Sequence, residues 1–349
     1  MTCLKKIFSL FLAPLLLTLL LWFLTDATVT YSLGIRGFSS FLITDRTVGH
    51  TNKPNFSGRF GGFLDSFSAL VSIGPLGERK STAGSCKDLP FFLFMGDSTT
   101  AGFEVNDDET FVSEINRDCK TTHITGANFG VRAYDTHEVI PNYRRISRLV
   151  HHDAVLYLIT ENDLVENTEL FPYPNVAKHF GRIFWGTYYL PTTSRSENAY
   201  LNFRIFLSDH LYMTTKAAQV IETWHSDQSE SRYANGIPAD QAETLIKLVE
   251  TLSSSVKNNG ARLYVAAYPC LSAYRCGGPD VEKLLREASD RSKDFVVLPL
   301  AIDLDSKFAN GEIKREDMRF YNDMHLSKFG HEVLGKELAQ MLGELRQPR

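Results

Sequence analysis

The chain has 349 residues, which is enough for one large domain or two modest ones. Hydrophobic residues make up 43% and charged residues 22% of it, as in ordinary folded proteins and unlike disordered chains. The net charge of -4, with no basic stripe that alternates with aromatic residues, argues against nucleic acid as a partner.

The N-terminus carries a membrane signal. Lys5 and Lys6 precede an uncharged, mostly apolar run over residues 7–24. A helix needs about twenty such residues to span a bilayer, and the run has no polar face that would suit a core helix. A cleaved signal peptide is the alternative, but the residues after Leu24 form a poor cleavage site. We therefore predict a signal-anchor over residues 1–26, and the lysines before it place the rest of the chain outside the cytoplasm.

Five cysteines accompany this segment. Cys3 lies beside it, either unpaired or lipidated. The other four are Cys86, Cys119, Cys270 and Cys276, an even number in a compartment that permits disulfides. Four cysteines allow three pairings, and the short spacing of Cys270 and Cys276 would let them close a loop. No spacing typical of a metal site is present, so we expect no metal and no cofactor.

The rest of the chain alternates strands and helices. Residues 27–88 read as an extended lead-in that packs partly on the main domain, which we place at 89–349. Short apolar runs predict buried strands at 91–95, 124–129, 154–159, 263–267 and 295–298. Helical patterns lie at 109–118, 136–150, 238–257, 281–292 and 327–345. This order predicts a parallel sheet with helices on both faces, a three-layer α/β/α sandwich.

An aromatic-rich insertion at about 165–235 interrupts the alternation. It forms either a unit with its own small core or a lid over the active site, and the sequence leaves both open.

Two segments carry residues suited to acyl transfer. The strand at 91–95 runs directly into Gly96-Asp97-Ser98, which places a hydroxyl at the carboxyl edge of the sheet, where open α/β sheets bind ligands. Near the other end, Asp323 precedes His325 by two residues, a spacing that brings both side chains to one side of an extended segment. A nucleophilic serine needs such a base and an orienting partner for it. Each segment alone is compatible with an ordinary turn.

Four short blocks, taken in order, resemble those of the SGNH (GDSL) hydrolase family. They are Gly96-Asp97-Ser98, Gly130 after the second strand, Asn162-Asp163 after the third, and Asp323-x-His325 before the last helix. The resemblance covers roughly residues 89–164 and 262–349, and it implies the flavodoxin-like sandwich of that family. Two positions depart from the family pattern: Thr160 replaces the glycine of the third block, and Asn322 stands where the acid of the fourth block is usual.

The resemblance also implies roles for these residues. Ser98 is expected to be the nucleophile, His325 the base and Asp323 its orienting acid. The backbone N–H groups of Ser98 and Gly130 and the side-chain amide of Asn162 are expected to form the oxyanion hole. We expect Asp97 and Asp163 to brace loops, and His331 to pack or cap rather than to react.

The function expected from these features is a membrane-anchored serine esterase on the periplasmic or extracellular side. Its substrate is expected to be an acyl ester of a small molecule, a glycan or a lipid. One rival is an O-acyltransferase that moves acetyl groups to a surface polysaccharide with the same residues. Another is a non-catalytic glycan-binding or assembly component that keeps the fold.

Overall fold

The computed structural model describes residues 2–45, 48–82, 86, 88–160, 163, 167, 206–207, 209–223, 239–269, 281–321, 323 and 325–344. Its strands are β1 (Leu42–Asp45), β2 (Gly49–Asn52), β3 (Ser57–Gly61), β4 (Ser68–Ser72), β5 (Phe91–Met95), β6 (Thr125–Asn128), β7 (Ala154–Ile159), β8 (Arg262–Ala267) and β9 (Val296–Leu298). Its helices are α1 (Thr2–Ser32), α2 (Ser98–Ala101), α3 (Phe111–Arg117), α4 (Cys119–Thr122), α5 (Thr136–Ile146), α9 (Tyr212–Thr223), α10 (Ala239–Asn258), α11 (Val281–Ser292), α12 (Leu300–Ala309) and α13 (Lys328–Glu344), with single 3-10 turns η1 (Phe38–Phe41) and η3 (Arg315–Met318).

Five parallel strands form the central sheet in the order β6-β5-β7-β8-β9. All five correspond to strands predicted from the apolar runs, and β7 matches its prediction residue for residue. Because the strands are parallel, the loops that follow β5, β6 and β7 leave from one edge of the sheet. Those three strands are neighbours, so their loops are brought together there.

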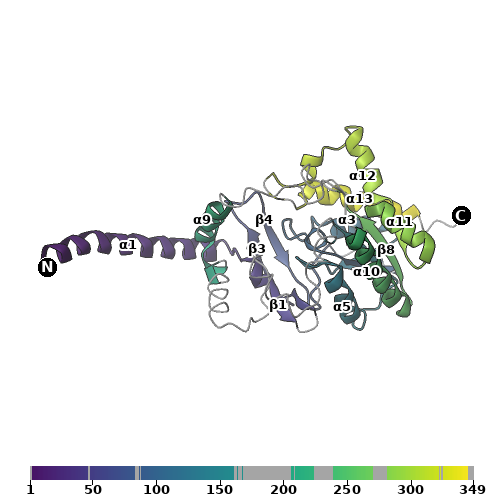
Figure 1. The fold of residues 1–349 in the computed structure, drawn as a ribbon, viewed down its shortest axis with the longest axis horizontal. Helices are drawn as coiled ribbons and strands as arrows, with labels where there is room; N and C mark the ends of the chain where they lie inside the picture. The colour runs from purple at the N-terminus through teal and green to yellow at the C-terminus, as the bar shows by residue number, and fades with distance from the viewer. Residues whose placement is uncertain are drawn as a thin grey trace.

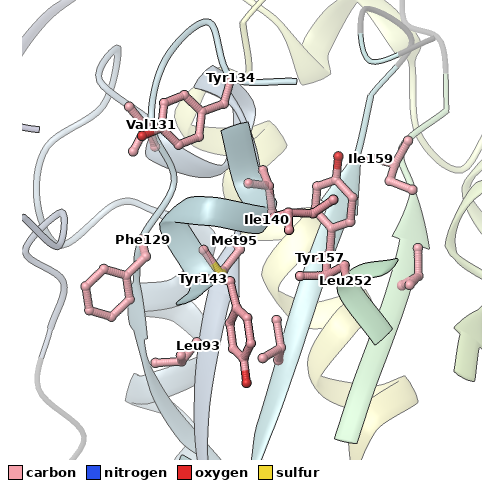
Figure 2. Close-up of a cluster of buried hydrophobic side chains, with 14 of the residues drawn as sticks. Leu93, Met95, Phe129, Val131, Tyr134, Ile140, Tyr143, Tyr157, Ile159 and Leu252 are labelled. Atoms are coloured by element: carbon pink, nitrogen blue, oxygen red, sulfur yellow. The ribbon is translucent and has the colours of Figure 1, made fainter. Parts of the chain in front are cut away.

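Helices cover both faces of this sheet, which confirms the three-layer α/β/α architecture. Successive side chains of β5 point to opposite faces, with Leu93 and Met95 in one core and Phe92 and Phe94 in the other. The first core is closed by residues of α5, α10 and α11, and the second by residues of α3, α12 and α13. Figure 2 shows part of the first core, including Leu93 and Met95.

The lead-in forms more structure than the sequence indicated. It holds two antiparallel hairpins, β1–β2 and β3–β4. Phe41 and Val71 from this segment lie fully buried in the first core. The guanidinium of Arg79, also fully buried, pairs with Asp107 and donates to the carbonyl of Val105. Residues 27–82 are therefore part of the folded body, because they supply core side chains and buried hydrogen bonds.

The N-terminal helix α1 extends away from the rest of the molecule (Figure 1). Its segment Leu12–Ser32 is long and apolar enough to cross a membrane, and the large apolar side chains from Leu15 to Leu24 are exposed. Exposure of this kind is expected of a helix whose surroundings are lipid rather than protein.

One disulfide is present among the described residues, between Cys86 and Cys119, with 6.1 Å between their Cα atoms. It closes a loop with a sequence separation of 33 residues, which corresponds to about 4 kcal/mol of stabilisation through loop entropy. Of the three pairings left open by the sequence, this bond is compatible only with the one that joins Cys270 to Cys276. Those two cysteines lie outside the described residues, as does most of the aromatic-rich insertion.

Two buried histidines predict how stability depends on pH. Burial lowers the pKa of His331 to about 3, with Arg79 and His325 adding to the effect, and burial also lowers that of His50 to about 3. Between pH 6.5 and about 3 the unfolded chain therefore binds more protons than the folded one, so stability falls as pH falls through this window.

The free energy of unfolding falls by about 1.4 kcal/mol per pH unit for each histidine, at pH values where that histidine is protonated in the unfolded chain and neutral in the folded one. His331 Nδ1 accepts a hydrogen bond from the Phe111 amide, 3.3 Å away. His331→Asn keeps an acceptor there and removes the titrating ring. Urea unfolding at pH 8, 6 and 5 should show that the free energy of unfolding depends less steeply on pH in this variant. An unchanged dependence would contradict a contribution from His331.

Candidate active site

The sharp turn after β5 presents Ser98 at the carboxyl edge of the sheet. Asp97 caps the short helix α2, its Oδ1 accepting from the Thr99 amide at 2.8 Å. At Gly96 a Cβ atom would lie 2.2 Å from Thr100 Oγ1 and 2.9 Å from the Leu158 carbonyl oxygen. Only glycine therefore lets the chain turn this close to β7.

The Ser98 side chain is available for chemistry. It is half-buried, and its Oγ makes no hydrogen bond among the residues that the structure describes. Its own N–H is the first amide of α2, where no intrahelical acceptor exists, and it also has no partner within the described chain. A half-buried hydroxyl beside an amide with no partner among the described residues suits a nucleophile whose oxyanion is bound by its own backbone.

The loop after β6 packs directly on α2. A Cβ atom at Gly130 would lie 2.4 Å from the Ala101 nitrogen, so this glycine is required by close backbone contact. The Gly130 N–H donates to Asn128 Oδ1 at 2.9 Å, and Asn128 Nδ2 donates to the Thr100 carbonyl at 2.7 Å. An oxyanion would have to compete with Asn128 for that N–H, and the role of Gly130 as a donor stays a prediction.

The loop after β7 explains the threonine of the third block. Thr160 Oγ1 donates to Asp97 Oδ2 at 2.7 Å, and the Thr160 amide donates to Asp163 Oδ2 at 2.8 Å. Burial, together with the charge of Asp97, raises the pKa of Asp163 well above its usual range. These bonds tie β5 to β7, as expected for residues that brace loops. Asn162, the expected third oxyanion donor, lies outside the described residues.

The segment before α13 holds the expected base and acid together. Asp323 Oδ1 accepts from the His325 backbone amide at 2.8 Å and lies 2.5 Å from His325 Nδ1. Burial would raise the pKa of Asp323, but the hydrogen bonds and charge of His325, together with the charge of Arg132, outweigh it and hold the pKa below the usual range. Asp323 is then ionised at neutral pH and accepts the Nδ1–H, which leaves Nε2 as the basic nitrogen.

A second carboxylate, which the sequence analysis did not identify, lies beside the same imidazole. Glu104 is only 3% exposed, and its Oε1 lies 3.4 Å from His325 Nδ1. Arg132, two residues after Gly130, forms an ion pair with Glu104. Glu104 follows Ser98 closely in sequence, and Arg132 follows Gly130 closely. This proximity is the only feature of the sequence that could have identified the two residues. Their pairing spans 28 residues and is visible only in the folded chain.

The four blocks therefore meet at one edge of the sheet. Ser98 and Glu104 follow β5, Arg132 follows β6, and the ion pairs of Glu104 reach both Arg132 and His325. No hydrogen bond joins Ser98 Oγ to His325 within the described part of the chain. Contacts of this kind are often long in a free enzyme and shorten when substrate binds.

The Glu104–Arg132 pair predicts opposite shifts in the pH profile. Glu104→Gln removes a negative charge beside His325, so the pH below which kcat/KM declines should fall. Arg132→Gln removes a positive charge and should raise that pH. Among the described residues, the charged or titratable groups near the imidazole are Asp323, Glu104 and the neutral His331, with Arg132 paired to Glu104.

The measurement is kcat/KM for a soluble ester between pH 5 and 9, with melting temperatures recorded to monitor folding. Shifts of the same sign in both variants would contradict this electrostatic effect, and unshifted profiles with lowered melting temperatures would show that the pair acts only on stability.

Comparison with known proteins finds several solved structures that are similar to this chain. No family model and no curated protein matches the chain. A structure described as a putative lipolytic protein of the G-D-S-L family from Desulfitobacterium hafniense matches at 12% identity and a TM-score of 0.39, over 72% of this chain and 99% of that one. TesA matches at 10% identity and a TM-score of 0.44, over 73% and 99%. An acetyl xylan esterase from Geobacillus stearothermophilus matches at 11% identity and a TM-score of 0.43, over 75% and 96%. The fold assigned above rests on the strand order of this chain, and the site on its own contacts.

Proposed function

We propose that this chain is a membrane-anchored, extracytoplasmic serine esterase that hydrolyses an acyl ester of a glycan or lipid. The observation that carries the proposal is the His325–Asp323 pair, which lies beside Glu104, a residue of the segment that also carries Ser98, whose hydroxyl has no hydrogen bond to any described residue. A hydroxyl, an imidazole with a free Nε2 and a carboxylate on its Nδ1 are the groups that acyl transfer through a serine needs.

The reaction follows from these positions. Ser98 Oγ attacks the ester carbonyl carbon while His325 Nε2 takes the hydroxyl proton. The tetrahedral oxyanion is bound by the Ser98 N–H, with Gly130 and Asn162 as the further expected donors. His325 returns the proton to the leaving alcohol, and an acyl-Ser98 ester remains. Water then attacks this ester, His325 takes its proton, and the carboxylic acid leaves as Ser98 Oγ recovers that proton.

Two features support the proposed location. The exposed apolar surface of α1 suits a lipid environment, and the lysines before it favour a cytoplasmic N-terminus. The Cys86–Cys119 disulfide suits an oxidising compartment outside the cytoplasm. Both features support a location of the folded body outside the cytoplasm.

Covalent labelling tests the nucleophile. The purified chain should react with a fluorophosphonate, and digestion should place the added mass on the peptide that contains Ser98. It should also release carboxylic acid from chromogenic esters without any sugar acceptor. Labelling confined to another residue would contradict the site. Acid release that appears only as a minor product beside transfer to an added glycan would favour the acyltransferase.

A further inference from the structure

Asp26 joins the membrane helix to the folded body. This carboxylate follows the exposed apolar stretch of α1 but is itself fully buried. Its Oδ1 accepts from the Met213 amide at 2.8 Å, and its Oδ2 accepts from the amide and the hydroxyl of Thr214, each at 2.7 Å. Thr30 Oγ1 accepts from the Tyr212 amide at 2.9 Å. Residues of α1 thus satisfy the free amides at the start of α9, where a negative charge is also favourable.

The loop between β3 and β4 is fastened to the same place. Tyr212 OH donates to Asp65 Oδ2 at 2.8 Å and accepts from the Leu64 amide at 2.8 Å. The ring of Phe63 lies 5.3 Å from the ring of Tyr212, and Lys216 of α9 pairs with Asp65. The backbone of this loop is therefore held in place by hydrogen bonds, and its one charged side chain, Asp65, is paired with Lys216.

Large apolar side chains are nevertheless exposed around this junction. Phe63 is 58% and Leu64 54% exposed, although their loop is hydrogen-bonded in place. Tyr31 at the end of α1 and Phe206 just before α9 are also exposed. We call Tyr31, Phe63, Leu64 and Phe206 the collar. Figure 1 shows α9 beside the end of α1 where that helix meets the body.

The distance along α1 places Asp26, the residue through which α1 holds the start of α9, at the depth of lipid headgroups, with Tyr31 just beyond that layer. At about 1.5 Å per residue, Asp26 lies roughly 3 Å and Tyr31 roughly 10 Å beyond Leu24. The headgroup layer on each side of a bilayer is about 5–8 Å thick. Aromatic side chains prefer that layer, where one end of the ring is wet and the other apolar.

We propose that the collar inserts into the outer boundary of the bilayer that α1 crosses, so that the catalytic body rests on the membrane in one orientation. The proposal depends on the membrane anchor of the proposed function. The same loop that carries Phe63 and Leu64 also reaches the active site, since the Phe67 ring lies 5.4 Å from that of Phe320, close in sequence to Asp323. Insertion of the collar into the bilayer therefore holds the active site at a fixed position relative to the lipid surface.

Site-specific photocrosslinking in native membranes tests this contact. A p-benzoylphenylalanine replaces Phe63 in one variant, Leu17 of α1 in a second and Leu149 in a third. Leu17 is the positive control for the anchor. Leu149, which follows α5 on the body, is 59% exposed and so matches Phe63 in exposure. We expect phospholipid adducts at positions 17 and 63 and at least tenfold less adduct at position 149.

Each of the other outcomes would overturn a stated part of the proposal. An adduct at position 17 without one at 63 overturns the collar and leaves the anchor in place. No adduct at position 17 overturns the anchor itself. Equal adducts at 63 and 149 overturn a specific orientation. Adding Asp26→Ala should reduce the adduct at 63 at least threefold while that at 17 persists, and an unchanged adduct at 63 would show that Asp26 does not hold the collar in place.

Discussion

Replacing Ser98 with alanine should lower kcat/KM for ester hydrolysis by about 10⁴-fold or more, because no other hydroxyl occupies its place at the start of α2. The fold should survive, since α2 is capped by Asp97 and the Ser98 side chain makes no hydrogen bond within the described structure. The variant should also lose its reaction with fluorophosphonates.

The matched control for this variant is Thr99→Ala, which removes a neighbouring half-buried hydroxyl from the same helix. It should keep activity within about threefold of the unaltered chain, as expected for a side chain outside the reaction. Rates for both variants, measured with one chromogenic ester alongside melting temperatures, separate chemistry from folding. Hydrolysis by Ser98→Ala at the rate of the control would remove the basis for the proposed function.

His325→Ala should produce the second large effect, a loss of about 10³- to 10⁴-fold in kcat with the fold retained. Without the imidazole no group takes the serine proton at neutral pH. The residue is partly exposed and sits in a loop before α13, so its removal leaves both cores intact. Single-turnover rates should show that both acylation and deacylation slow, because His325 serves as the base in each step.

Asp323→Asn provides the informative comparison. It keeps an oxygen acceptor for the His325 amide but removes the charge, and Glu104 still places a carboxylate near Nδ1. We expect a smaller loss than for His325→Ala, and the double variant Asp323→Asn with Glu104→Gln should approach it. Full activity in the double variant would show that neither carboxylate supports the base.

The structure confirms the predictions that depend on neighbouring residues. The strand β5 was recognisable because five apolar residues in a row suit only a strand buried on both faces. The helix α11 begins and ends where its periodicity indicated. The hairpins of the lead-in were missed, because their short strands have no regular alternation of apolar and polar residues. Helix α12 was also missed, since it directly follows β9 and Pro299 without a cap that would mark its start.

For the site, the sequence alone was enough to propose Ser98, Asp323 and His325, because each stands in a short motif next to a strand or helix end; their catalytic roles stay predictions. The tertiary structure decided what surrounds them: Glu104 and Arg132 at the imidazole, Thr160 between two carboxylates, and the pairing of Cys86 with Cys119. It also joined Asp26 to a helix almost two hundred positions away. Local patterns record the propensities and burial of adjacent residues. Contacts between distant residues depend on which loops the packed sheet brings to one edge, and short segments of sequence do not encode that geometry.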